Sequence, residues 1–220
     1  MNNIITIDGP GGSGKSTISR MLARKINFLY LDTGAMYRAV ALAANREDID
    51  FRDGKRLGEL CGLLDLHFDT DEEPPSLFLG NEDISMAIRG PEMDMFSSEV
   101  SAVKEVREAM VSIQRKMARG TKVVAEGRDM GTVVFPEAGH KFFLTASHEV
   151  RAERRYKERL ERGEAVLRSV VEAELKRRDR QDETRSISPL RPAEDAIVID
   201  STGLDPEEVV EEILDHLAGS

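Results

Sequence analysis

The residues best suited to chemistry lie near the start of the chain. The stretch GPGGSGKS at residues 9–16 fits the pattern GxxxxGK[ST]. Glycines let the backbone bend so that several N–H groups point into one concavity, and a following helix N-terminus adds positive potential. In such a loop the lysine reaches the β- and γ-phosphates, and the next hydroxyl ligates Mg²⁺. We therefore predict a polyphosphate site in which Lys15 is catalytic and Ser16 holds the metal; its binding residues are Gly9, Pro10, Gly11, Gly12, Ser13, Gly14, Lys15, Ser16 and Thr17.

The flanks of the loop support this prediction. A strand pattern, NIITID at 3–8, precedes it, and a helical pattern at 15–26 follows it. A strand before and a helix after are the context that a phosphate loop requires. The alternative is a glycine-rich turn that only joins strand to helix; it is disfavoured because the Lys-Ser pair and both flanks are present.

A second charged stretch, LDTGAMYR at 31–38, overlaps the end of the predicted strand 28–32. It places Asp32 and Thr33 at the carboxyl end of that strand, where α/β sheets hold their ligands. Arg38 then lies on the next helix, directed at a second anion. The alternative is a helix start in which Asp32 or Thr33 is the N-cap and Arg38 is a solvated charge.

A third stretch, AEGRDMGTVVFP at 125–136, follows the predicted strand 122–126. Gly127 provides a tight turn, and Arg128 and Asp129 stand at the carboxyl end of the strand. As a surface ion pair they would contribute little. Their position at the ligand edge of a sheet favours a binding role.

The elements that must position these residues alternate along the chain. Short apolar runs predict five strands, at 3–8, 28–32, 122–126, 141–145 and 196–200. Helical patterns occur at 15–26, 101–119, 148–162 and 165–178, and a last helix opens with the capping box Asp205-Pro206-Glu207-Glu208. This alternation predicts an α/β fold of the P-loop NTPase type, a five-stranded parallel sheet with helices on both faces.

Two stretches depart from the alternation. Residues 62–100 contain LDLHFD, a Glu-Glu-Pro-Pro turn and SLFLGNEDIS, which predict a small antiparallel β insert. The helix 148–162 is polar nearly all round, so we expect it to pack little and to move. Residues 165–178 regain an apolar stripe through Val166, Val170, Val171 and Leu175.

Composition excludes several classes of protein. The net charge of −10 argues against general binding of nucleic acid polymers, although 13 of the Lys and Arg residues fall within 151–191. The longest apolar run, AVALAA at 39–44, is far shorter than a membrane span. The start of the chain lacks the pattern of a signal peptide, and the single Cys61 suggests a reducing compartment, so we expect a cytoplasmic protein. The polar surface weakly favours a monomer.

Four motifs in order, DGPGGSGKST, DTGAMYR, EGRDMGTVVFP and RDRQDETRSISPL, resemble those of the bacterial-type cytidylate kinases, members of the nucleoside monophosphate kinase family. The resemblance extends over essentially the whole chain. It implies transfer of the γ-phosphoryl group of ATP to CMP or dCMP, with Mg²⁺. It also implies three parts: a P-loop core at 1–61, 101–150 and 186–220, an acceptor-side insert at 62–100, and a helical lid at 151–185.

Site roles follow from the resemblance, motif by motif. Thr33 and Arg38, with Asp32 beside them, match the acceptor-binding helix. Base-contacting positions are matched by Ser98, Arg107 and Asp129, and a phosphate clamp by Arg128. The sugar and its phosphate side are matched by Asp182 and Arg185, with Arg178 assisting. The lid arginines Arg151, Arg154 and Arg155 are catalytic candidates that reach the transferring phosphoryl group on closure.

Each of these sets has a plainer alternative. Arg178, Asp182 and Arg185 share one helical face, so a salt-bridged surface is the alternative for them. For the lid arginines the alternative is pairing with Glu153 and Glu158 in solvent. Cytosine offers an amino donor that a carboxylate accepts, so we expect CMP to be preferred to UMP.

Three other functions compete with a cytidylate kinase. Another small-acceptor kinase would share the phosphate loop but lack the GRDMGTVVF and RSISPL motifs. A GTPase switch would carry NKxD after a later strand, and none is present. A nucleic-acid-binding module is disfavoured by the net charge and by the single aromatic residue, Tyr156, within 151–191.

Overall fold

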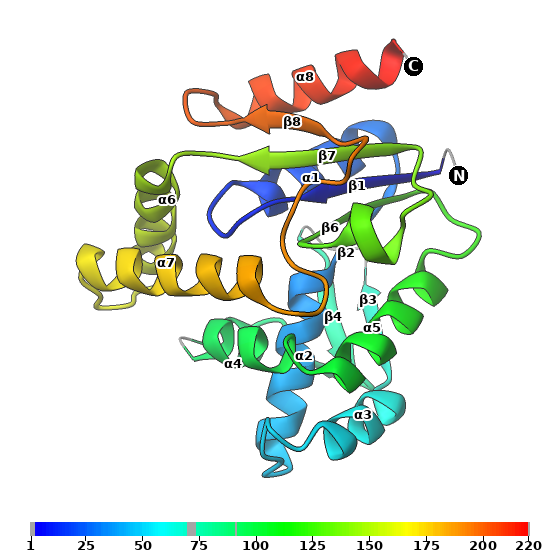
Figure 1. Cartoon of the computed structure of the whole chain (residues 1–220), viewed down its shortest axis with the longest axis vertical. Coiled ribbons are helices and arrows are strands. Elements are labelled where there is room, and N and C mark those ends of the chain that lie inside the picture. Colours follow the sequence, from blue (N-terminus) through cyan, green and yellow to red (C-terminus); the bar gives the residue numbers. More distant parts are fainter. Residues whose placement is uncertain (1–2, 70–73, 91, 220) are drawn as a thin grey trace. The chain divides into compact units, whose positions relative to one another are not determined.

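The computed structural model describes residues 3–69, 74–90 and 92–219. It divides into two compact units (Figure 1). The first unit comprises residues 1–31 and 121–220, and the second comprises residues 32–120. Each unit has its own apolar core, so each is described by itself.

The sheet of the first unit has the strand order β2-β6-β1-β7-β8. The neighbours β6 and β1, β1 and β7, and β7 and β8 pair in parallel. Their bounds are β1 Ile4–Asp8, β2 Leu29–Asp32, β6 Val123–Gly127, β7 His140–Thr145 and β8 Ile197–Asp200. Each predicted strand agrees with an observed one to within a residue, and the parallel α/β fold class is confirmed.

The α-helices of the first unit are α1 Lys15–Ile26, α6 His148–Glu161, α7 Arg168–Thr184 and α8 Pro206–Ala218. The apolar faces of α1 and α8 share one core with the strands, centred on buried residues such as Ile7, Leu22 and Ile213. The expected capping box of the last helix is present, with Asp205 Oδ1 accepting from Glu208 N at 2.9 Å. The helices α6 and α7 lie beyond the carboxyl end of β7 (Figure 1).

The second unit is mainly helical and carries a small antiparallel sheet, in the order β3-β4-β5. Its elements are α2 Thr33–Arg46, α3 Gly54–Leu63, β3 Leu66–Asp69, β4 Ser76–Leu79, β5 Glu82–Asp83, the 3₁₀ turn Ala87–Arg89, α4 Met93–Val100 and α5 Lys104–Met117. The predicted antiparallel insert is confirmed. The first two residues of its expected Glu-Glu-Pro-Pro turn, 72 and 73, lie outside the described residues.

Two predicted helices differ from the observed ones in their bounds. The pattern at 101–119 forms α5, but Val103 is its N-cap rather than part of the helix. The helix predicted at 165–178 is α7, which begins and ends later than predicted. Val166 therefore precedes α7, and Asp182 lies within it. Periodicity could not place the far end of this helix, because residues 176–184 are polar and show no apolar period.

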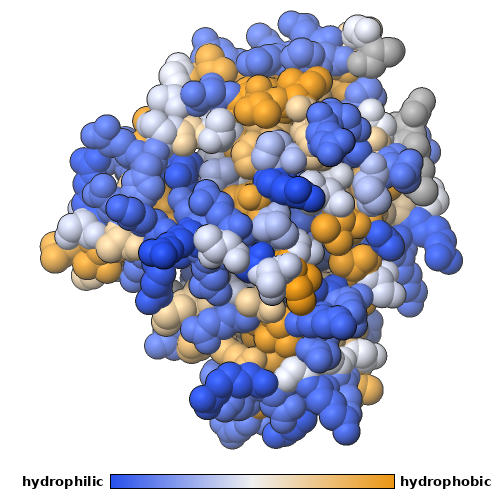
Figure 2. Space-filling model, viewed as in Figure 1, coloured by the Kyte–Doolittle hydropathy of each residue, from blue (hydrophilic) through white to orange (hydrophobic). Residues whose placement is uncertain are grey.

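The surface is largely hydrophilic, as expected for a chain in which 33% of the residues are charged. Figure 2 shows that hydrophilic residues cover most of the face it displays, with smaller hydrophobic areas between them. Across the described part of the chain, no helix has the length and apolar character needed to cross a membrane.

Candidate active site

The stretch predicted to bind phosphate is a tight loop between β1 and α1. Gly12 and Gly14 adopt positive φ values of 73° and 92°, which side chains rarely tolerate. A Cβ atom at Gly9 would overlap the carbonyl oxygen of Leu144, and one at Gly12 would lie 2.7 Å from the carbonyl oxygen of Arg151. The glycines are therefore required both by backbone conformation and by close approach of neighbouring strands and helices.

Lys15 is buried at the start of α1, where its ammonium donates to the carbonyl of Pro10 at 2.7 Å and to Ser13 Oγ at 3.4 Å. Burial, together with the nearby Arg128 and Arg178, lowers the pKa of Lys15 well below its ordinary value; Glu126 and Asp8 oppose the shift only in part. Burial and the two arginines thus disfavour the charged form of this lysine. A bound polyphosphate would stabilise that charge, as a phosphate loop requires.

Two of the predicted lid arginines hold the loop from α6. The guanidinium of Arg151 donates to the carbonyls of Ala146 and Gly11, both at 3.0 Å, and to Asp179 Oδ2 on α7 at 2.6 Å. Arg154 donates to the carbonyls of Ser13, at 3.3 Å, and Ser201, at 2.7 Å. Both side chains therefore join the phosphate loop to elements more than 130 residues away in the chain.

Arg155 has different surroundings. It donates to Glu158 Oε2 at 2.5 Å, and burial lowers its pKa from the ordinary value while Glu158 opposes the shift. The alternative of pairing with Glu158 therefore describes Arg155, but not Arg151 or Arg154, which donate to Asp179, Ser201 and backbone oxygens. Glu153 lies near Lys157 and Arg168 instead.

The stretch after β6 forms a charged cluster with the end of α7. Arg128 Nε donates to Asp182 Oδ2 at 2.8 Å. Arg185, the C-cap of α7, lies 3.9 Å from Asp129 Oδ1 and 4.0 Å from Asp182 Oδ1. Burial alone would raise the pKa of Asp182, but Arg128, Arg178 and Arg185 outweigh it and hold that pKa below its usual value. The structure thus brings together Arg128, Asp129, Asp182 and Arg185 of the predicted site within the first unit.

Asp8, the last residue of β1, connects this cluster to the phosphate loop. Its two carboxylate oxygens accept from the backbone N–H groups of Met130 and Gly131, each at 2.8 Å. Those residues begin a π-helical turn, Met130–Val134, that directly follows Asp129. Burial raises the pKa of Asp8 to about 6, and the two backbone hydrogen bonds and Lys15 limit the rise.

The second unit holds five predicted acceptor residues, Asp32, Thr33, Arg38, Ser98 and Arg107, in two groups. In the first group, Asp32 is the N-cap of α2 and accepts from Ala35 N at 2.7 Å, while Arg38 lies 3.6 Å from Asp32 Oδ2. Thr33 is buried beside them. The helix-start alternative is therefore correct for Asp32, and Arg38 is half-buried and paired rather than solvated.

The second group lies on α4 and α5. Arg107 is buried, donates to the carbonyl of Ser101 at 3.0 Å, and its guanidinium lies 5.5 Å from the ring centre of Tyr37. Ser98 is buried and its carbonyl accepts from Ser101 Oγ at 2.9 Å. Two donors predicted to contact a base therefore lie on adjacent elements of one unit.

The expected metal ligand is compatible with a nucleotide-bound ion. Ser16 is exposed at the first turn of α1, and Mg²⁺ commonly takes most of its ligands from phosphates and water. Within the described ranges, no group of three or more His, Cys, Asp or Glu residues is placed to hold a metal ion.

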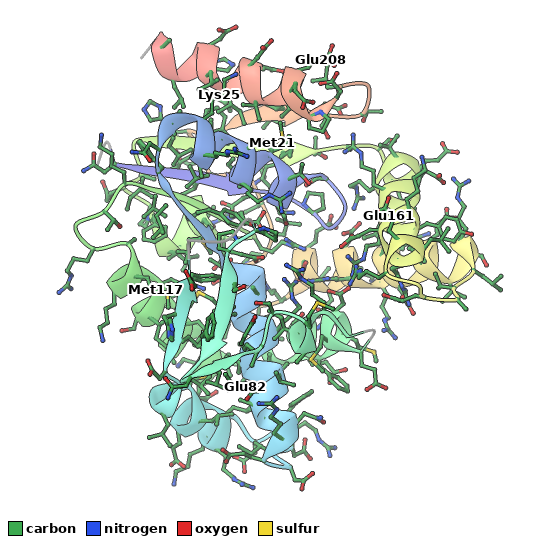
Figure 3. All side chains as sticks on the ribbon, turned by 180° about the vertical axis from the view of Figure 1, so that it is seen from behind. Met21, Lys25, Glu82, Met117, Glu161 and Glu208 are labelled. Carbon is green, nitrogen blue, oxygen red and sulfur yellow. The ribbon has the colours of Figure 1, made fainter. Side chains whose placement is uncertain are left out.

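A hollow of about 410 Å³ lies elsewhere, between α1 and α8, as the labels Met21, Lys25 and Glu208 help to locate (Figure 3). Its lining consists of Met21, Arg24, Lys25, Glu207, Val210 and Glu211. None of the predicted site residues lines it.

Four residues of these networks were not assigned from the sequence: Asp8, Tyr37, Asp179 and Ser201. Asp8 and Tyr37 stood inside the quoted motifs, next to residues that were assigned. Asp179 precedes Asp182 by three positions, on the same face of a helix, which was a usable signal. Ser201 follows the last strand of the sheet and had no local signal.

A phosphate loop at the end of the central strand of a parallel sheet, with buried lysine and arginines around it, defines a P-loop phosphotransferase. A solved structure, an uncharacterized protein from Eubacterium ventriosum, shares this fold with a TM-score of 0.54 and 15% identity over the full length of both chains. The model of the Cytidylate kinase family matches residues 5–218, and the chain belongs to that family.

Curated relatives carry the same family name. The chain is 49% identical over 208 residues to a cytidylate kinase of Geobacter sp. (strain M21), which covers 94% of this chain and 89% of the relative. It is 44% identical over 214 residues to a cytidylate kinase of Vibrio cholerae, covering 97% and 95%. The family resemblance inferred from the four motifs is thus confirmed.

Proposed function

We propose that this protein is an ATP-dependent kinase that transfers the γ-phosphoryl group of ATP to CMP or dCMP, giving ADP and CDP or dCDP. The observation that carries the proposal is membership of the cytidylate kinase family over residues 5–218, with an intact phosphate loop. Its place is pyrimidine nucleotide metabolism. We further propose that it acts as a monomer in the cytoplasm and binds no nucleic acid polymer or membrane.

The donor side is the phosphate loop. Backbone N–H groups of residues 9–17, apart from Pro10, and the ammonium of Lys15 hold the phosphates of ATP, and the Ser16 hydroxyl is a ligand for Mg²⁺. When bound, Mg²⁺ neutralises charge on the phosphates. Arg151 and Arg154 hold the loop in shape through its Gly11 and Ser13 carbonyls.

The acceptor side is carried by the remaining predicted residues. Asp129 accepts from the cytosine amino group, while Arg107 and Ser98 donate to its ring nitrogen and carbonyl. The acceptor phosphate binds Arg38 and Arg128. Asp182, Arg185 and Arg178 bind the sugar and its phosphate side, and Asp32 and Thr33 shape the start of α2. The insert 62–100 serves as the acceptor-side part.

Closure of the helical part 151–185 over the bound nucleotides would exclude water, so that ATP is not hydrolysed. Arg155 is the lid arginine best suited to reach the transferring group, because Arg151 and Arg154 already hold carbonyls of the phosphate loop. No general base is required, since the acceptor phosphate is already a good nucleophile at neutral pH. Catalysis then consists of positioning and charge neutralisation.

The proposal is tested with one panel of acceptors, CMP, dCMP, UMP, AMP, GMP and shikimate, each with ATP and Mg²⁺. The readout is diphosphate formed, with ADP release measured in parallel. We expect CMP and dCMP to be phosphorylated far better than UMP. Preference for AMP, GMP or shikimate would assign the chain to another acceptor class, and equal kcat/KM for CMP and UMP would remove the proposed base recognition.

Asp129→Ala tests the residue that distinguishes the bases. Loss of a hydrogen bond to a charged acceptor should lower the CMP/UMP ratio of kcat/KM about 10- to 100-fold. Asp215→Ala is a matched control, since Asp215 is exposed on α8. An unchanged ratio in the Asp129 variant would mean that this carboxylate does not contact the base.

A further inference from the structure

The carboxylate of Asp8 is an unusual group to find buried at the end of a central strand. It is only 4% exposed, and both of its oxygens accept from consecutive backbone N–H groups, those of Met130 and Gly131. A carboxylate is the side chain that offers two acceptors and no donor, so it matches two adjacent N–H groups in a way that an amide or a hydroxyl does not. This geometry fixes the backbone immediately after Asp129.

Packing around the same turn leaves it little freedom. A Cβ atom at Gly131 would lie 3.0 Å from Thr6 Oγ1, 3.2 Å from Lys141 Cδ and 3.4 Å from Asp8 Oδ2. At the far end of the turn, Lys141 donates to the carbonyl of Pro136 at 2.6 Å and is paired with Asp195. Asp8 therefore holds the start of the turn, next to Asp129. Lys141 holds the backbone just after the other end of the turn.

We propose that Asp8 is a positioning residue for base selection: its carboxylate fixes the turn 129–134 and so sets where the Asp129 side chain meets the acceptor base. The proposal rests on the proposed function, in which Asp129 distinguishes cytosine from uracil. Asp8 also directly precedes Gly9 of the phosphate loop. One strand end thereby fixes both the loop that holds the donor and the turn that selects the acceptor.

The charge state of Asp8 makes the idea testable without a substitution. Its pKa of about 6 arises mainly from burial, with Asp129 raising it and Lys15 lowering it. The other charged groups nearby are engaged elsewhere: the Lys141 ammonium with Pro136 and Asp195, and Glu126 with the Tyr30 hydroxyl at 2.8 Å. Protonation converts one oxygen of Asp8 into a hydroxyl, which weakens the hold on one of the two N–H groups.

The experiment measures the CMP/UMP ratio of kcat/KM between pH 7.5 and 5.5, in the unsubstituted enzyme and in Asp8→Asn. Substrate phosphates also titrate near pH 6, but that effect is common to both acceptors and cancels in the ratio. We expect the ratio of the unsubstituted enzyme to fall about 3- to 10-fold as the pH drops through about 6. In Asp8→Asn the ratio should be low at all pH values and nearly independent of pH.

Val209→Ala is the control for a merely structural effect. Val209 lies on the buried face of α8, so the substitution lowers stability without touching the turn. Its ratio should equal that of the unsubstituted enzyme. A wild-type ratio in folded Asp8→Asn, or a pH-independent ratio in the unsubstituted enzyme, overturns the inference. Failure of the unsubstituted enzyme to phosphorylate either pyrimidine nucleotide overturns the proposed function itself.

Discussion

Replacement of Arg151 by methionine should separate its role from that of Arg155, although both were predicted as lid arginines that reach the phosphoryl group. Arg151 makes three contacts inside the first unit, to Gly11, Ala146 and Asp179. Arg155 contacts Glu158 one turn further along its own helix. The two substitutions remove the same charge from the same helix. Differences in stability or kinetics between the two variants therefore reflect the different surroundings of Arg151 and Arg155.

The expected magnitude follows from burial. The side chains of Arg151 and Asp179 are 9% and 10% exposed, and breaking such a pair from one side typically costs about 3–5 kcal/mol. Asp179 Oδ1 has no hydrogen-bond partner of its own, so Asp179 depends on Arg151. For a chain of this size the loss lowers Tm by roughly 6–20 °C. Arg155 is 20% exposed and its partner Glu158 is 53% exposed, so its pair is partly screened and Arg155→Met should cost less than Arg151→Met.

Thermal unfolding followed by circular dichroism, with steady-state kinetics on each variant, is the assay. Arg151→Met should lose much stability and raise the KM for ATP, because the phosphate loop loses its support at Gly11. Arg155→Met should lower the Tm less than Arg151→Met does, and should lose kcat. The double variant Arg151→Met/Asp179→Leu should regain part of the lost stability, since it leaves no buried charge unpaired.

A Tm for Arg151→Met within a degree or two of that for Arg155→Met would refute this reasoning, because a buried pair cannot then be supporting the loop. A large fall in kcat at unchanged KM and Tm would instead assign Arg151 to the transition state, as the family resemblance implied.

Three further perturbations have defined outcomes. Burial raises the pKa of Asp8 to about 6, against an ordinary value of 3.8. This shift contributes roughly 3 kcal/mol to the free energy of unfolding below pH 4, and the contribution is lost as the pH rises through 6. Asp8→Asn should flatten this part of the pH dependence of the free energy of unfolding. Gly9→Ala should abolish ATP binding because the added Cβ overlaps the Leu144 carbonyl, whereas Gly203→Ala, with nothing within 4 Å of its Cβ, should behave as the unsubstituted protein; ATP titration by calorimetry compares them. Asp205→Ala should lower the free energy of unfolding in urea by about 1 kcal/mol through loss of the capping box, with no change in KM.

Local pattern was sufficient for much of the fold. The five strands are short apolar runs, and α1 and α8 carry signals that act within a few residues: the glycine loop before one, and the Asp-Pro-Glu-Glu start of the other. The limits of α7 could not be found this way. Its last turns are polar, and tertiary contacts such as that between Asp182 and Arg128 hold them.

The sequence was sufficient to predict residues of the candidate site, but not the contacts that these residues make. The motifs identified Arg128 and Asp182, and the helical spacing of the lid arginines identified Arg151. No local pattern tells that Arg151 binds the carbonyl of Gly11, 140 positions away. Burial of Arg107 and Gln114 on α5 was likewise hidden, because polar residues on a helix are expected to face water. Such contacts depend on the order of strands in the sheet, which periodicity does not encode.

The strand order has a consequence for how the chain folds as it leaves the ribosome. The first two strands, β1 and β2, are not neighbours, because β6 lies between them. β6 begins at Val123, about ninety residues after the end of β2. At typical synthesis rates β1 and β2 wait roughly 5–20 seconds for the partner they share. The second unit, residues 32–120, has its own core and emerges entirely within that interval. Synthesis from the N-terminus therefore favours folding of the second unit first. The sheet of the first unit forms around β1 only when β6 and then β7 have been synthesised.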